Sequence, residues 1–168
     1  MMVATGTPSP PPVTCTAGHE WQHLVGLVLD AGQRAASYGA RYMNAYMDHS
    51  GCGGLGVALW LGYGAEIRGD GASAVETQAV GRAGMQGDAS AVGVELAAGA
   101  ASTFGGGNIA LGTATVLLDF YYFGLGASYR FPIGSPRPSW LGEAEFALRI
   151  QVPVHTYGKY EKKWTEPR

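Results

Sequence analysis

Charge is scarce in this chain. Only 14% of its 168 residues are Asp, Glu, Lys or Arg, whereas 46% are hydrophobic. Soluble proteins carry more surface charge, which keeps copies apart, so we expect something apolar to cover this surface. The 11 basic and 13 acidic residues are scattered and form no basic stripe. Nucleic acid is therefore not expected as a partner.

Long apolar runs are also missing. Gly, Glu, Arg or Asp interrupts every candidate stretch before it reaches the ~20 apolar residues of a spanning helix. If the chain crosses a bilayer, we expect it to do so with strands. The first 15 residues hold neither a basic nor an apolar segment, so we do not expect them to act as a secretory signal.

Residues that bind metals and cofactors are few. Cys15 and Cys52 have no metal-ligand spacing, and they form either a disulfide or two unrelated thiols. His19, His23 and His49 are too dispersed to predict a metal site. The only glycine triplet, 105–107, lacks the continuation of a phosphate-binding loop. We expect neither a metal nor a cofactor.

The N-terminal third has a composition of its own. Residues 1–18 are rich in Pro, Thr, Ser and Gly, which predicts a flexible arm. Over 19–50, polar residues recur at spacings of three, four and seven, which is the period of an amphipathic helix. Three glycines within that segment weaken a helix and leave a first hairpin as the alternative. A Cys15–Cys52 bond would favour the hairpin or a helix broken at Gly32 or Gly39, because a straight helix would hold the cysteines far apart.

After Gly54 the period changes to two, which indicates strands. Alternation runs through 55–68 and, for about 16 residues, through 140–155, longer than an average soluble strand but suited to a tilted bilayer crossing. Four more alternating segments lie between them, mostly separated by Gly or Pro turns: 74–86, 91–101, 108–118 and 123–131. The sequence predicts an antiparallel up-and-down barrel with six strands over 54–157, or with eight if residues 19–50 form a hairpin, followed by a polar tail over 158–168.

The two faces of these strands differ in chemistry. One face is bulky and apolar, and we expect it to meet lipid: Val57, Leu59, Leu61, Tyr63, Ile67, Phe123, Leu125, Phe146, Leu148, Ile150 and Val152. The other is mostly Gly, Ala and Ser, punctuated by charges: Glu66, Arg68, Glu76, Arg82, Glu95, Arg130, Glu143, Glu145 and Arg149. Small residues leave room inside a narrow barrel, where balanced charges can pair. We therefore predict an interior ion-pair network; an exposed polar sheet face is the alternative.

Three segments carry a resemblance to known proteins: GLGVALWLGYGAEIRG, FYYFGLGASYRFPIG and WLGEAEFALRIQVPV. They resemble strands of small bacterial outer-membrane β-barrels of the OmpA/OmpX-like type, over about residues 54–157. The resemblance implies a location in the bacterial outer membrane, membrane lipid as partner, and a structural, scaffold or small-pore role without enzymatic activity. A six-strand sheet would further require closure by a homo-oligomer or a larger assembly.

Two other functions remain open at this stage. A soluble β-barrel that binds a lipid or another hydrophobic ligand would alternate in the same way, with the apolar face inward. A barrel-borne lipid-modifying enzyme would need catalytic side chains on one face. For that function the candidates are His155 and the carboxyl pair Glu143 and Glu145.

Overall fold

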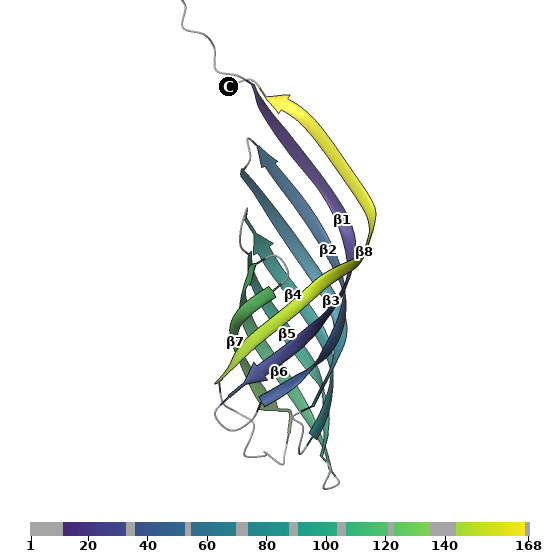
Figure 1. Ribbon diagram of the computed structural model, residues 1–168, viewed down its shortest axis with the longest axis vertical. Helices are drawn as coiled ribbons and strands as arrows, with labels where there is room; N and C mark the ends of the chain where they lie inside the picture. Colours follow the sequence, from purple (N-terminus) through teal and green to yellow (C-terminus); the bar gives the residue numbers. More distant parts are fainter. Residues whose placement is uncertain are drawn as a thin grey trace, which may run out of the picture.

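The chain folds into a single closed β-barrel, seen in the computed structural model of Figure 1. The structure describes residues 12–32, 36–52, 55–69, 74–87, 91–103, 107–120, 123–134 and 144–166. They form eight strands: β1 (Val13–Ala31), β2 (Ala36–Cys52), β3 (Leu55–Gly69), β4 (Ala74–Gln86), β5 (Ala91–Thr103), β6 (Gly107–Phe120), β7 (Phe123–Pro132) and β8 (Ala144–Glu166). Within these ranges, no helix is long and apolar enough to span a membrane.

All neighbouring strands are antiparallel. Each strand pairs with the next in sequence, and β8 returns to pair with β1, which closes the ring. The prediction of a mainly β, up-and-down antiparallel barrel is confirmed, and the strand number is eight. Because the ring closes within one chain, the barrel itself leaves no need for partner subunits to complete the sheet.

The N-terminal helix prediction is wrong. Residues 19–50 lie in β1 and β2, which pair from Cys15 with Cys52 down to Ala31 with Ala36. The helical spacing of the polar residues in this segment is coincidental, because Asp30 and Arg41 point into the barrel and Val25 and Leu27 are exposed outside. The glycines that weakened the helix are tolerated in strands, where pairing to two neighbours holds the backbone.

The predicted ends of the barrel also change. Residues 13–18, expected in the flexible arm, belong to β1, and residues 158–166, expected as a polar tail outside the barrel, belong to β8. The two segments hold each other in place, since Val13 pairs with Glu166 and Ala17 with Lys162. Neither segment has enough apolar residues to be recognised as a strand from alternation alone.

The strands differ in length, so one end of the barrel projects. β8 has 23 residues and β1 has 19, whereas β7 has 10 and pairs with β8 only as far as Ile150. In Figure 1, β8 and β1 continue well past the other strands on the side where the described chain begins and ends, and β2, with the start of β3 beside it, extends past β4, β5, β6 and β7. We call this projection the terminal ribbon; it comprises Val13–Glu20, residues 47–52 and residues 159–166.

Two features shape the terminal ribbon. The Cys15–Cys52 disulfide joins β1 to β2 near its tip. At its base β8 contains Gly158, which has φ of 62°, a conformation that glycine adopts without steric cost. Gly158 lies within the register shift between His19 and Trp21, and a second shift follows between His23 and Leu24.

Candidate functional site

The barrel interior is lined largely by charged and polar side chains, with apolar ones such as Val28, Met43 and Leu117 among them. Among the described residues, its charged groups are five guanidinium and six carboxylate groups, ten of them buried and Asp119 partly so: Asp30, Arg41, Glu66, Arg68, Glu76, Arg82, Glu95, Asp119, Arg130, Glu145 and Arg149. They come from all eight strands, because each strand turns alternate residues inward. Burying an isolated charge here would cost on the order of several kcal/mol, so the stability of the fold depends on the pairing of these groups.

Six of these side chains form a closed ring of alternating charge across the middle of the barrel. Arg41 contacts Glu66 and Glu95, each at 2.7 Å. Arg149 bridges Glu95 at 3.2 Å and Asp30 at 2.8 Å.

Arg68 completes the ring by pairing with Asp30 and, at 2.5 Å, with Glu66. Every member has two oppositely charged neighbours, and the ring joins β1, β2, β3, β5 and β8. Side-chain exposure in the ring is at most 3%. We call this set the central ring.

A second cluster lies toward the terminal ribbon. The Arg82 guanidinium donates to Gln151 at 2.6 Å and to Asp119, and it lies 3.3 Å from Glu95 of the central ring. Its carbon also sits 4.1 Å above the Trp60 ring, a cation–π arrangement. Gly84 makes room for the indole, because a Cβ there would lie 2.7 Å from Trp60 Nε1.

A third cluster lies toward the opposite end. Arg130 binds Glu145 in a bidentate arrangement, at 2.5 and 2.8 Å, and Glu76 at 2.6 Å. Gln78 donates to Glu76 and accepts from Thr113. Arginine suits such positions because its planar fork binds two carboxylate oxygens at once.

The structure brings together most of the residues predicted for the interior. Eight of the nine are buried there and ion-paired: Glu66, Arg68, Glu76, Arg82, Glu95, Arg130, Glu145 and Arg149. The ninth, Glu143, lies outside the described residues. Three members were missed. Asp30 and Arg41 lie in the segment predicted as a helix, and Asp119 lies in a turn region without clear alternation. The hairpin alternative places Asp30 and Arg41 at inward-facing strand positions.

The outer face of the barrel is apolar on every strand. The eleven residues predicted to face lipid all point outward, and ten of them are 36–62% exposed, while Leu148 is half-buried. Strands outside that prediction add exposed residues of the same kind, among them Leu27, Met85, Leu96 and Leu118. The usual arrangement of a folded protein, apolar inside and polar outside, is inverted here.

An aromatic cluster lies on this outer face at the base of the terminal ribbon. Trp21 stacks on Tyr157 with ring centroids 6.3 Å apart, and His23 stacks on Tyr157 at 4.9 Å and on His155 at 5.8 Å. Asn44 is the polar centre: it donates to the Tyr63 hydroxyl at 3.0 Å and accepts from the Tyr157 hydroxyl at 3.2 Å. Polar groups on this face thus satisfy one another.

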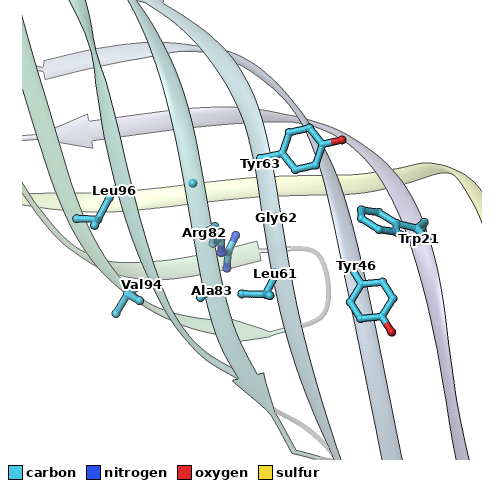
Figure 2. A pocket seen from close by; sticks show the side chains of 10 residues that line it. Trp21, Tyr46, Leu61, Gly62, Tyr63, Arg82, Ala83, Val94 and Leu96 are labelled. Atoms are coloured by element: carbon cyan, nitrogen blue, oxygen red, sulfur yellow. The ribbon is translucent and has the colours of Figure 1, made fainter.

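A shallow groove of about 520 Å³ runs beside this cluster (Figure 2). Trp21, Tyr46 and Tyr63 line one side of it, and Val94 and Leu96 the other, while Arg82 points away into the barrel. The floor is low because the residues of β4 that face outward here, Gly81 and Ala83, are small. The groove is apolar, and therefore suited to an aliphatic chain and not to a charged group.

The residues considered for catalysis are not assembled into a site. His155 was expected on the same face as Glu145 and Arg149, but the register shift next to His23 turns it to the outer face, where it stacks on His23 and Tyr157. Glu145 is inside, bound to Arg130. The two side chains therefore lie on opposite sides of the barrel wall.

Metal ligands are equally sparse in the part of the chain that the structure describes. The one group with suitable spacing there is Cys15, Cys52 and Glu166, and its sulfur atoms are joined in the disulfide. Comparisons of the chain with protein-family models, with curated proteins and with solved structures find no match.

Proposed function

We propose that this protein is a β-barrel of the bacterial outer-membrane type that serves as a structural anchor for its terminal ribbon. The observation that carries the proposal is the inversion of the two faces: ion pairs fill the interior, and all eight strands present apolar side chains outward. In water this arrangement would expose a continuous apolar surface; in a bilayer the same surface is covered by acyl chains.

The dimensions of the apolar face support a bilayer. On β3 it extends from Val57 to Ile67, which is roughly 34 Å along the strand at ~3.4 Å per residue. A strand tilt of ~45° reduces this to a height of roughly 24 Å, close to the ~25 Å apolar band of outer-membrane barrels. The groove beside the aromatic cluster would then hold part of a lipid acyl chain.

The disulfide and the connections support an orientation. Disulfides persist in oxidising compartments such as the bacterial periplasm, and Cys15–Cys52 lies in the terminal ribbon. The longest connection, between Pro132 and Ala144, leaves the barrel at the opposite end. Outer-membrane barrels have short periplasmic turns and longer outer loops, so the terminal ribbon would face the periplasm.

The interior favours an anchor over a pore or a carrier. An eight-stranded barrel is narrow enough for its side chains to fill, and here the central ring crosses the lumen from β1 to β5. A soluble carrier of hydrophobic ligands would need an apolar interior, which buried guanidinium and carboxylate groups do not provide. We therefore expect low ion conductance and no interior lipid binding.

Membrane partitioning combined with heat-dependent gel mobility tests the proposal. The full chain is refolded into phosphatidylcholine vesicles, floated on a density gradient, and run in SDS with and without boiling. Flotation together with a mobility change on boiling is the expected result, because a folded membrane barrel resists SDS until heated. A protein that stays folded and monomeric in detergent-free buffer would contradict the proposal and reverse the assignment of the outer face.

A further inference from the structure

The terminal ribbon has one free edge. Residues 159–166 of β8 pair with β1 on one side, from His19 opposite Tyr160 to Val13 opposite Glu166. On the other side β7 stops pairing at Ile150, and no described residue pairs with β8 beyond that point. Such an edge presents unpaired N–H and C=O groups at about every second residue, which is the template that strand addition uses.

This edge is held in a fixed shape. The disulfide ties the neighbouring strand β1 to β2 near the tip of the terminal ribbon. Tyr160 stacks on His19 with ring centroids 5.4 Å apart, and Trp164 Nε1 donates to Glu166 at 3.0 Å. A partner that pairs with a preformed strand does not have to order it first, which lowers the cost of binding.

The edge carries a surplus of positive charge. Lys159 and Lys163 share a single carboxylate, Glu161, at 3.9 and 2.9 Å, and both lysine side chains are at least 60% exposed. The hydrogen bond and charge of Lys163 lower the pKa of Glu161, so this carboxylate is ionised at neutral pH. Lys162 lies on the other face of the strand, opposite Ala17, and has no ion pair among the described residues. Glu166 lies on the same face as Lys162, so residues 159–166 present three ammonium groups and two carboxylates, and the surplus of positive charge is on the face of Lys159 and Lys163.

We propose that the free edge of β8, residues 159–166, binds an extended acidic segment of another protein by strand addition. The edge supplies the main-chain hydrogen bonds, and Lys159, Lys162 and Lys163 select for carboxylates at the facing positions. Lysines on an exposed edge also discourage uncontrolled pairing. The two roles are compatible, because the same charges repel a basic strand and attract an acidic one.

A second copy of the chain fits the edge poorly. Antiparallel pairing of two β8 edges would place the barrels at opposite ends of the paired strands, so that they could not share one bilayer. Parallel pairing in register would set each lysine opposite its own counterpart, which is destabilising. Only this exclusion rests on the proposed membrane function; the free edge and its charge do not.

Residues 1–11 of the same chain are also a poor occupant. Pro8, Pro10 and Pro11 have no N–H to donate to a ladder, and the segment contains no acidic residue.

A binding assay on the full-length protein, refolded in neutral detergent, tests the proposal. The probe is a fluorescein-labelled decapeptide of alternating Thr and Glu, and the matched control probe alternates Thr and Lys. We expect the acidic probe to bind at least about 10-fold more tightly by fluorescence anisotropy. The fully N-methylated acidic probe should not bind, because it keeps the charge and loses every donor.

Two protein variants separate charge from fold. Replacing Lys159, Lys162 and Lys163 by Glu should reverse the preference to the basic probe, whereas replacing all three by Arg should preserve the acidic preference. Heat-dependent gel mobility of each variant checks the barrel without any peptide. A variant that folds and binds peptide but does not enter vesicles would overturn only the membrane proposal.

Four results would overturn the strand-addition proposal. The first is that the folded protein does not bind the acidic probe, and the second is that the N-methylated probe binds equally well. The third is that the protein forms dimers in analytical ultracentrifugation that disappear in the Glu triple variant. The fourth is probe binding that appears only after deletion of residues 1–11. The last two results would assign the edge to a second copy and to the N-terminal segment, respectively.

Discussion

Arg41 is the most informative single residue for the interior, because its guanidinium connects two carboxylates of the central ring. In Arg41→Met, Glu66 and Glu95 each lose one of their cationic neighbours while remaining buried. Removing one partner of a buried pair costs about 3–5 kcal/mol, because a charge is left without compensation. Glu95 keeps Arg149 and Arg82, and Glu66 keeps Arg68, so we expect a loss of about 3 kcal/mol in the free energy of unfolding.

The assay is urea unfolding of the protein in lipid vesicles, followed by the loss of the unboiled gel band. Arg41→Lys keeps the charge but cannot bridge two carboxylates with a planar fork, so its loss should be smaller, about 1–2 kcal/mol. Lys162→Met removes an exposed cation from the terminal ribbon and is the matched control, with no change expected. If Arg41→Met and Lys162→Met destabilise equally, the central ring does not hold the barrel together.

Three further predictions concern the outer face, the disulfide and the lumen. Leu96→Arg places a charge midway along the exposed face of β5 and should lower the free energy of unfolding in vesicles by about 2–4 kcal/mol, whereas Leu96→Ala should have a much smaller effect. Equal effects would argue against a lipid-facing position. Replacing Cys15 and Cys52 by Ser opens a loop with a sequence separation of 37, which should lower the free energy of unfolding by up to about 4 kcal/mol. Trypsin should then cleave the terminal ribbon, while the barrel keeps its heat-dependent gel mobility. Protection of the ribbon in this variant would show that strand pairing alone holds it. In planar bilayers the native barrel should show no conductance steps, because the central ring closes the lumen. A variant in which Arg41, Glu66 and Glu95 are replaced by Ala should show such steps. Steps of equal size in both proteins would contradict closure by the central ring.

Alternation alone identified the strands where each face had uniform chemistry. In β3 and β8, bulky apolar residues alternate with small or charged ones, so both the strand and its faces could be predicted. In β1 and β2 the outward positions include His23 and Asn44, and the inward ones include Val28 and Met43, so the parity is mixed. The polar residues of these two strands recur at spacings of three and four, which predicts a helix, although glycines within the segment disfavour one.

The partners inside the barrel could not be read from the sequence. Parity shows that Arg149 points inward, but its contact with Asp30 exists only because β8 closes onto β1, 119 residues away in the chain. His155 shows the same limitation on the outside, because one extra residue in the ladder reverses its face. Pro153, which lies at that shift, is compatible with a bulge but does not fix its position.

The sequence by itself determined that the chain forms long antiparallel strands with an apolar and a charged face, because side chains alternate along every strand whatever the strand pairs with. Only the tertiary structure decided three things: that the strands number eight and close into one ring, that the charges meet as a central ring with two flanking clusters, and that β8 outruns β7 and leaves a free edge. Each of these depends on which strands become neighbours and in what register. Register is a relation between distant segments, and no local pattern in a single segment contains it.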